Sequence, residues 1–178
     1  MTSSSRPVTT ALVALPWILV VALTALNLLH MSRLGPNDDA YITFRVARNL
    51  AAGYGPVFNP GEQVLSVTTP GYMLLLAAAS VVSRDFVRLG LALNGVALLL
   101  VGALVIDLSH IMSPTGPETS QAKLLSALSA TLAVSLTLTF PLLTAAIGME
   151  TPLFIAAILA TFAAYRRALQ PANDERST

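Results

Sequence analysis

Five apolar stretches separated by short polar segments dominate the pattern of this 178-residue chain. Four of them are close to the roughly 20 residues that an α-helix needs to cross the hydrocarbon core of a bilayer. The second has only 14 residues and starts at a Pro-Gly step, which favours an interfacial or re-entrant helix over a span. In chain order the stretches are Ala11–Met31, Thr69–Val82, Phe86–Ser109, Leu124–Ile147 and Pro152–Leu169.

The behaviour of the short stretch, Thr69–Val82, decides the topology. If it does not cross, the chain spans the membrane four times, and Arg166 and Arg167 fall on the cytoplasmic side, as the positive-inside rule prefers. If it crosses, those arginines move outside and Glu150 moves to the cytoplasm. Two other arginines lie outside in the four-span arrangement, so the rule is not unanimous. The sequence favours four spans, with both termini in the cytoplasm.

The overall composition agrees with a membrane protein. Hydrophobic residues make up 54% of the chain and charged residues 11%, with a mean hydropathy of +0.71, whereas soluble domains carry about 25% charged residues. We therefore expect an all-α, polytopic integral membrane protein that forms a single membrane domain over residues 1–178. Residues 32–85 are expected to form an extracytoplasmic loop with juxtamembrane amphipathic helices and a short interfacial or re-entrant helix. The first stretch is interpreted as a retained anchor, and a role as signal anchor alone is the alternative.

Charge and residue usage exclude several classes of function. The net charge of +1 provides no strongly basic face for nucleic acid. The absence of cysteine excludes disulfides and thiolate zinc sites. The two histidines, His30 and His110, lie far apart in the sequence, which argues against a histidine-based metal centre.

Two adjacent carboxylates, Asp38 and Asp39, follow the first apolar stretch. Acids near a bilayer are costly and commonly functional, and the repulsion between neighbouring carboxylates favours protonation of one of them. Such a pair suits a general base or cation binding. Alternatively, Asp-Asp after Pro-Asn is typical of a turn, with Asp39 as the cap of the helix that follows.

The segment from Asp38 to Ala52 is predicted to form an amphipathic helix on the outer leaflet. Arg45 and Arg48 lie three residues apart and therefore near one another on the helix surface. Arginine can bind phosphate in a bidentate manner, so the pair could hold a phosphorylated substrate. Anchoring to anionic lipid headgroups is the alternative. Gly53 is a suitable residue to end this helix.

Glu150 stands in a short polar turn between two apolar helices, with no cation nearby in sequence. An acid in such a position needs a partner or a function. The alternative is an ordinary acid near a helix N-terminus, placed favourably before Thr151 and Pro152.

Other polar residues in the apolar stretches allow simpler interpretations. Asn27 and Asn94 are expected to form interhelical hydrogen bonds rather than to bind a ligand. Asp107 is interpreted as a solvated acid at the inner end of its span. Pro141 is expected to kink the fourth apolar stretch.

Three motifs occur in order along the chain: DDAYITFRVARNLAAGYGPVFNPGE from Asp38, TTPGYMLLLA from Thr68 and GMETPLF from Gly148. Together they resemble the bacterial membrane glycosyltransferases of the C-type fold (GT-C). Within that class the chain looks closest to actinobacterial proteins related to arabinofuranosyl- and mannosyltransferases. The resemblance covers the chain from the first helix to the one after Glu150. Family enzymes are several hundred residues long, so the likeness is to their N-terminal part.

The resemblance implies transfer of a sugar from a polyprenyl-phosphate donor to a cell-envelope acceptor, which could be a glycan, a glycolipid or a protein. It further implies a multi-pass protein of the inner (plasma) membrane that contacts membrane lipid and whose active face is extracytoplasmic. Asp38 or Asp39 would be the general base, and Glu150 the second acid. Candidate substrate-binding residues are Arg45 and Arg48 for the phosphate and Tyr72 as an aromatic contact. No protein metal site or cofactor is implied, although a divalent cation could bridge the carboxylates and the phosphate.

Two other classes of function compete with the transferase. A non-catalytic membrane subunit or truncated paralogue would assemble with another polytopic protein. A transporter or channel component would use the acids for ions, but the acids lie at the outer face, whereas proton relays need acids near the middle of the bilayer.

Overall fold

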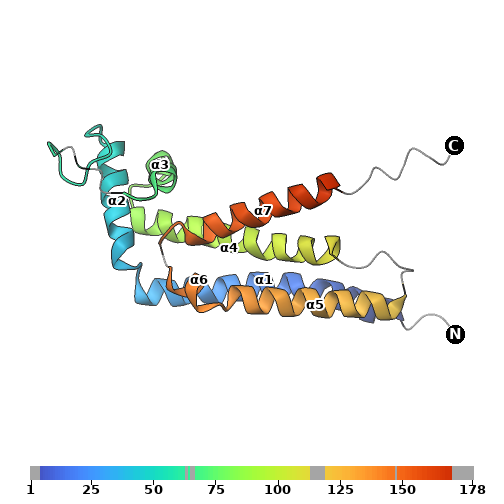
Figure 1. The fold of residues 1–178 in the computed structure, drawn as a ribbon. Helices are drawn as coiled ribbons and strands as arrows, with labels where there is room; N and C mark the ends of the chain where they lie inside the picture. Colours follow the sequence, from blue (N-terminus) through green and yellow to red (C-terminus); the bar gives the residue numbers. More distant parts are fainter. Residues whose placement is uncertain (1–4, 63, 65–66, 113–118, 147, 170–178) are drawn as a thin grey trace.

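The computed structural model describes residues 5–62, 64, 67–112, 119–146 and 148–169, and in these segments it is entirely helical (Figure 1). Four helices are long and apolar enough to cross a membrane: α1 (Ser5–Leu34), α4 (Phe86–Ile111), α5 (Ser120–Leu138) and α7 (Thr151–Leu169). The expected all-α fold with four candidate spans is confirmed.

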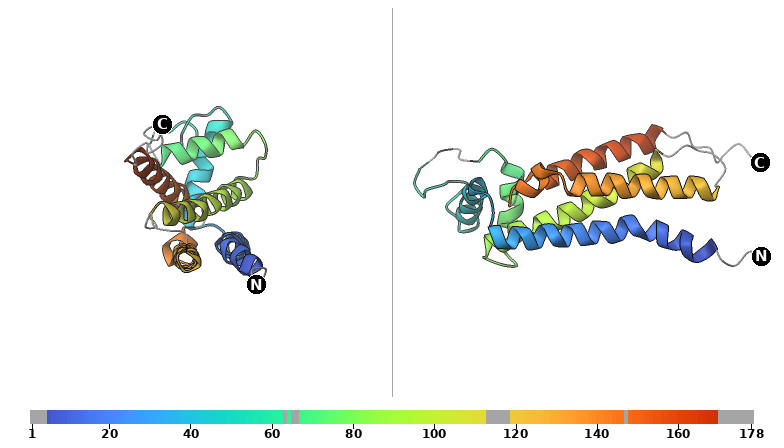
Figure 2. Two further views of the ribbon diagram at one scale, coloured as in Figure 1. Left: turned by 90° about the vertical axis from the view of Figure 1, so that its right-hand side faces the viewer. Right: turned by 90° about the horizontal axis from the view of Figure 1, so that it is seen from below.

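The four long helices run alongside one another as an elongated bundle (Figures 1 and 2). Helix α4 contacts α1, α5 and α7, and α1 also contacts α5. Two glycines of α4 permit close packing: a Cβ atom added at Gly102 would lie 2.6 Å from the side chain of Val20 in α1, and one at Gly95 would lie 3.0 Å from Leu28. Small residues allow helices in a membrane to approach closely and to gain dispersion contacts.

The outward surfaces of the long helices remain apolar. Large hydrophobic side chains such as Ile18, Val21, Leu132, Phe154 and Ile158 are all exposed. Exposed apolar side chains of this kind are expected on helices that lipid surrounds.

Two shorter helices, α2 (Asp38–Ala51) and α3 (Pro70–Ala79), lie at the end of the bundle where α1 ends and α4 begins (Figure 1). With 10 residues, α3 is about 15 Å long, which is half the thickness of a hydrocarbon core. Because α3 does not cross, α1 and α4 run in opposite directions, and the starts of α2 and α7 share one end of the molecule.

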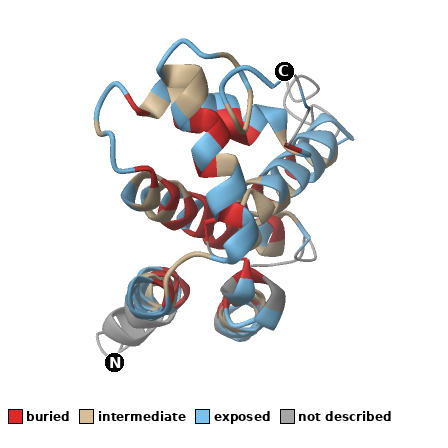
Figure 3. Cartoon of the chain, turned by 90° about the vertical axis from the view of Figure 1, so that its left-hand side faces the viewer, coloured by how far each residue is buried: buried red, intermediate tan, exposed pale blue. Residues whose placement is uncertain are grey.

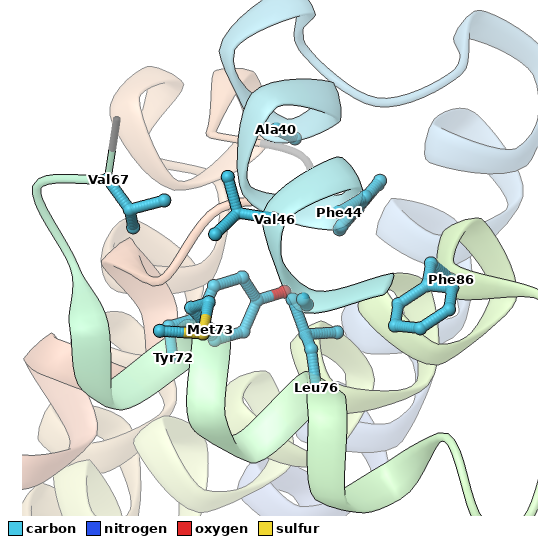
Figure 4. Close-up of a cluster of buried hydrophobic side chains, with 9 residues drawn as sticks. Ala40, Phe44, Val46, Val67, Tyr72, Met73, Leu76 and Phe86 are labelled. Carbon is cyan, nitrogen blue, oxygen red and sulfur yellow. The ribbon is translucent and has the colours of Figure 1, made fainter. Parts of the chain in front are cut away.

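A cluster of buried side chains joins these two short helices to the start of α4 (Figure 4). Phe44 and Val46 of α2 meet Tyr72 and Leu76 of α3, and Phe86 of α4 completes the cluster. Viewed from this end, buried residues gather where α2, α3 and α4 come together (Figure 3). The hydrophobic face of α2 is therefore largely covered by protein, although Tyr41, which the pattern places on that face, is 48% exposed.

The fourth apolar stretch differs from its expected form. Instead of a kinked span, α5 ends at Leu138 and a separate five-residue helix, α6 (Pro141–Ala145), follows. Proline lacks the amide hydrogen that a continuing helix needs and disfavours helical geometry in the residue before it. The prediction of a kink at Pro141 is thus corrected to a break. By contrast, Pro152 lies in the first turn of α7, where proline is readily accommodated.

Candidate functional site

The two aspartates form the first turn of α2, and Asn37 is the residue that caps the helix. The Asn37 Oδ1 atom accepts a hydrogen bond from the Asp39 amide at 3.2 Å, and the Ala40 amide donates to the Asn37 carbonyl at 3.0 Å. The alternative in which Asp39 caps the helix is therefore wrong. Asp38 and Asp39 are both exposed in this first turn.

The turn that precedes Glu150 is held by side chains from two other helices. Asn94 of α4, which is fully buried, donates from Nδ2 to the Met149 carbonyl at 2.8 Å and accepts from the Gly148 amide at 2.6 Å. Tyr72 of α3 donates its hydroxyl to the Gly148 carbonyl at 3.0 Å. The Met149 amide donates to Ala146. Every backbone polar group of Gly148 and Met149 therefore has a partner, as a buried turn requires.

The same turn packs directly against the start of α2. A Cβ atom added at Gly148 would lie 2.9 Å from Pro36 and 3.1 Å from Ala40, and the glycine has a φ of +79°. Both the left-handed conformation and the lack of space favour glycine here. Since Pro36 and Ala40 flank the aspartate pair in the chain, this contact brings the Glu150 turn to the helix end that carries Asp38 and Asp39.

Glu150 is half-buried beside an apolar groove between α3 and α7. The groove has a volume of about 390 Å³. Burial, and secondarily the negative charge of Glu150, raise the pKa of the Tyr72 hydroxyl above its ordinary value. Tyr72 therefore stays a hydrogen-bond donor to the Gly148 carbonyl. The residues lining the groove are Thr69, Gly71, Tyr72, Leu75, Glu150, Leu153 and Phe154.

Arg45 and Arg48 have different surroundings despite their spacing. Arg45 donates from Nε to the Phe58 carbonyl and from Nη2 to Asn59 Oδ1, each at 2.9 Å, and its guanidinium lies 4.3 Å from the centre of the Phe58 ring. The Arg48 guanidinium lies 5.4 Å from the centre of the Phe86 ring at the start of α4. Both side chains are exposed. Arg45 thus holds the loop after α2, while Arg48 lies over the beginning of a span.

Of the six residues proposed for the site, the structure relates Glu150 to Tyr72 through the groove and to the aspartate pair through the Gly148 contact. Arg45 points to a separate loop. No group of three or more His, Asp and Glu side chains in the described segments is arranged to hold a metal ion.

Sequence reasoning identified Asn94 as a hydrogen-bonding residue but missed its connection to the Glu150 turn. In the sequence, Asn94 stands out as one amide side chain in an otherwise apolar helix. That pattern does not reveal which backbone groups the amide binds. Asn27 also behaves as expected, donating to the carbonyls of Leu23 and Leu138 at 2.9 and 3.1 Å.

At the opposite end of the bundle, Asp107 of α4 pairs with Arg167 of α7 at 2.5 Å. The interpretation of Asp107 as merely solvated is corrected by this pair. The two residues connect the ends of adjacent helices, far from Asp38 and Glu150.

Comparison with known proteins finds one informative similarity. The chain is 41% identical over 73 residues to a terminal β-(1→2)-arabinofuranosyltransferase of Mycobacterium tuberculosis (strain ATCC 25618 / H37Rv). The aligned stretch covers 36% of this chain and 12% of that enzyme, so the match spans a small part of the relative. No protein-family model and no solved structure matches the chain. The chain thus shows a coarse, partial relationship to a glycosyltransferase.

Proposed function

We propose that this chain is a membrane glycosyltransferase, or the N-terminal part of one, that moves a sugar from a polyprenyl-phosphate donor to a cell-envelope acceptor on the outer face of the inner (plasma) membrane. The partial likeness to an arabinofuranosyltransferase supports the reaction class. The packing of Gly148 between Pro36 and Ala40 is the single observation that carries the proposal, because it brings separate acidic segments to one end of the bundle.

In the proposed reaction, Asp38 or Asp39 accepts the proton of the acceptor hydroxyl. The acceptor oxygen then forms a bond to the anomeric carbon, and the bond from that carbon to the donor phosphate breaks. The polyprenyl phosphate leaves with the electron pair. A base must lie within hydrogen-bond reach of the acceptor hydroxyl. The first turn of α2 is exposed, so an acceptor hydroxyl can approach its aspartates.

Glu150 is proposed to orient the sugar from the edge of the apolar groove, with the Tyr72 ring as part of the wall. Arg48 is the better of the two arginine candidates for the donor phosphate, because two nitrogens of Arg45 already donate to the loop after α2. A polyprenyl chain would remain in lipid while its phosphate lies at this end of the bundle. A divalent cation that bridges carboxylate and phosphate is compatible with the proposal but is not required by it.

The experiment is a transfer assay with a radiolabelled polyprenyl-phosphate sugar in membranes that contain the chain in its full-length context. We expect Asp38→Asn or Asp39→Asn to reduce transfer by roughly 10²- to 10⁴-fold, since a general base contributes about that much. Glu150→Gln should also reduce transfer. Asp85→Asn, which alters another exposed acid at the same end, is the matched control and should retain activity.

Unchanged transfer in both aspartate variants would reject the base assignment. The alternative, a non-catalytic subunit or truncated paralogue, predicts that all the acidic variants support the same transfer rate and that the chain co-purifies with a second polytopic protein.

A further inference from the structure

Residues 52–62, which follow α2, have a defined structure that the proposed chemistry leaves unexplained. Asn49 of α2 donates from Nδ2 to the carbonyls of Val57 and Phe58 at 2.8 and 2.9 Å. Arg45 donates to the Phe58 carbonyl and to Asn59, and its guanidinium stacks on the Phe58 ring. Two consecutive turns of α2 therefore hold residues 57–59 in place.

These contacts fix part of the wall of a cavity of about 480 Å³ that residues of this loop line. Its wall includes the Tyr54 side chain, which is 63% exposed, and the exposed carboxylate of Glu62. Asn59 donates from Nδ2 to Glu62 Oε2 at 3.0 Å, and Asn59 is itself held by Arg45. The chain therefore orients the carboxylate at the cavity, while Tyr54 offers a flat aromatic surface beside it.

An aromatic ring next to an oriented carboxylate fits a sugar. The C–H face of a sugar ring can pack on the tyrosine, whose ring combines a large apolar surface with a polar hydroxyl. The ionised carboxylate accepts hydrogen bonds only, so it complements the hydroxyl donors of a carbohydrate. Ligand sites are typically concave clefts of about 300–1,000 Å³ with a few well-placed polar groups, and this cavity falls within that range of volume.

The position of the cavity favours a soluble sugar over a lipid headgroup. The loop lies at the end of the molecule most distant from the long helices (Figures 1 and 2). The Glu62 carboxylate would also repel a lipid phosphate.

We propose that this cavity is a subsite for an oligosaccharide acceptor, separate from the point of transfer and resting on the proposed function. The 14 residues of α2, about 20 Å of helix, separate Asp38 from Tyr54. One sugar unit cannot reach both. An acceptor several units long can place its reacting end at the aspartates and a more distant unit on Tyr54. The subsite thus selects for acceptor length.

The first test measures binding alone, without a donor. The purified chain in lipid nanodiscs is titrated with a linear arabinose hexasaccharide, and binding is followed by saturation-transfer NMR. We expect Tyr54→Ala and Glu62→Gln each to weaken binding roughly tenfold, as the loss of a stacking or charge-assisted contact would. Tyr54→Phe should retain binding because the ring remains.

Tyr165→Ala is the matched control, because this tyrosine is 60% exposed on α7, far from the loop. Equal binding by the Tyr54→Ala and Tyr165→Ala variants would overturn the proposal. So would the absence of oligosaccharide binding to the unmodified chain. A Tyr54→Cys variant that a membrane-impermeant maleimide cannot label in the nanodisc would place this residue in lipid and also overturn the proposal.

The second test uses the transfer assay in the full-length context. Tyr54→Ala should raise the KM for a hexasaccharide acceptor roughly tenfold and leave kcat and the KM for a disaccharide unchanged. A fall in kcat for both acceptors would contradict a remote subsite. The two proposals can fail separately. If the chain is not a transferase, transfer is absent but binding still depends on Tyr54; if the subsite is wrong, binding does not depend on Tyr54.

Discussion

Asn94 shows how one buried amide can fix the position of a distant functional group. Its side-chain amide donates to the Met149 carbonyl, and its side-chain oxygen accepts from the Gly148 amide. Both polar groups of the side chain therefore pair with the backbone of the turn. In an apolar helix such a residue is costly unless both groups find partners. The position of Glu150 therefore depends on a residue 56 positions earlier in the sequence.

Asn94→Ala should lower the free energy of unfolding by roughly 2–4 kcal/mol, because it leaves buried backbone groups of the turn without partners. It should also reduce sugar transfer in the full-length context. Asn27→Ala, which removes another buried amide that bonds to Leu23 and Leu138, is the control. Thermal unfolding in detergent should show both variants to be destabilised, and only the Asn94 variant should lose transfer. Equal transfer by the two variants would contradict a positioning role.

Tyr72 should make stability depend on pH in the alkaline range. Its pKa in the folded protein lies above the ordinary value of about 10, so above that pH the unfolded chain releases a proton that the folded chain retains. Its contribution to stability is thus complete below pH 10 or so and declines as the pH rises further. Unfolding curves for Tyr72→Phe should show a weaker alkaline decline than those of the unmodified chain. Parallel pH dependences would argue against this assignment.

At the level of elements, α2 has two faces with separate tasks. One face contributes Phe44 and Val46 to the buried cluster with α3 and α4. The other uses Arg45 and Asn49 to hold the following loop. The helix therefore links the bundle of long helices to the structured loop that follows it.

Arg45→Ala should loosen the loop without unfolding the helix. Loss of its charge-assisted hydrogen bonds and of its contact with the Phe58 ring should increase hydrogen exchange at residues 55–62 by roughly ten- to a hundredfold. Arg48→Ala is the control, because Arg48 lies over Phe86 and not over the loop. Mass spectrometry of the exchanged peptides would measure the difference. Equal exchange in the two variants would show that Arg45 does not hold the loop.

At the level of the whole molecule, the two ends of the bundle differ in chemistry. One end carries the aspartate pair, the Glu150 turn and the short helices α2 and α3. The other carries the Asp107–Arg167 pair between α4 and α7. The two acidic segments share one end because two long helices, α4 and α5, lie between them in the chain and α3 adds no crossing.

The absence of cysteine from the sequence makes this arrangement directly testable by labelling single-cysteine variants. In intact cells, a membrane-impermeant maleimide should label Asp39→Cys and Glu150→Cys. It should label His110→Cys only after the membrane is permeabilised. Labelling of positions 39 and 150 from opposite sides would be incompatible with four spans and would separate the proposed catalytic residues.

The features that local composition controls were largely predictable. Apolar length distinguishes the spans from α3, because a helix must match the thickness of the hydrocarbon core. The alternation of polar and apolar residues after Asp38 predicts an amphipathic helix in the place where α2 lies. The break at Pro141 was harder to predict, since neighbouring helices can also accommodate a proline as a kink.

The candidate site depended on contacts that no local pattern encodes. Three contacts depend on shape and hydrogen-bonding geometry. Asn37 rather than Asp39 caps α2, Arg45 binds the loop after α2, and Gly148 packs against Pro36. Hydrophobicity says that a segment enters the membrane, but it does not say which turn touches which helix. The spans therefore follow from the order of the residues, while the meeting of the two acidic segments follows only from how the helices pack.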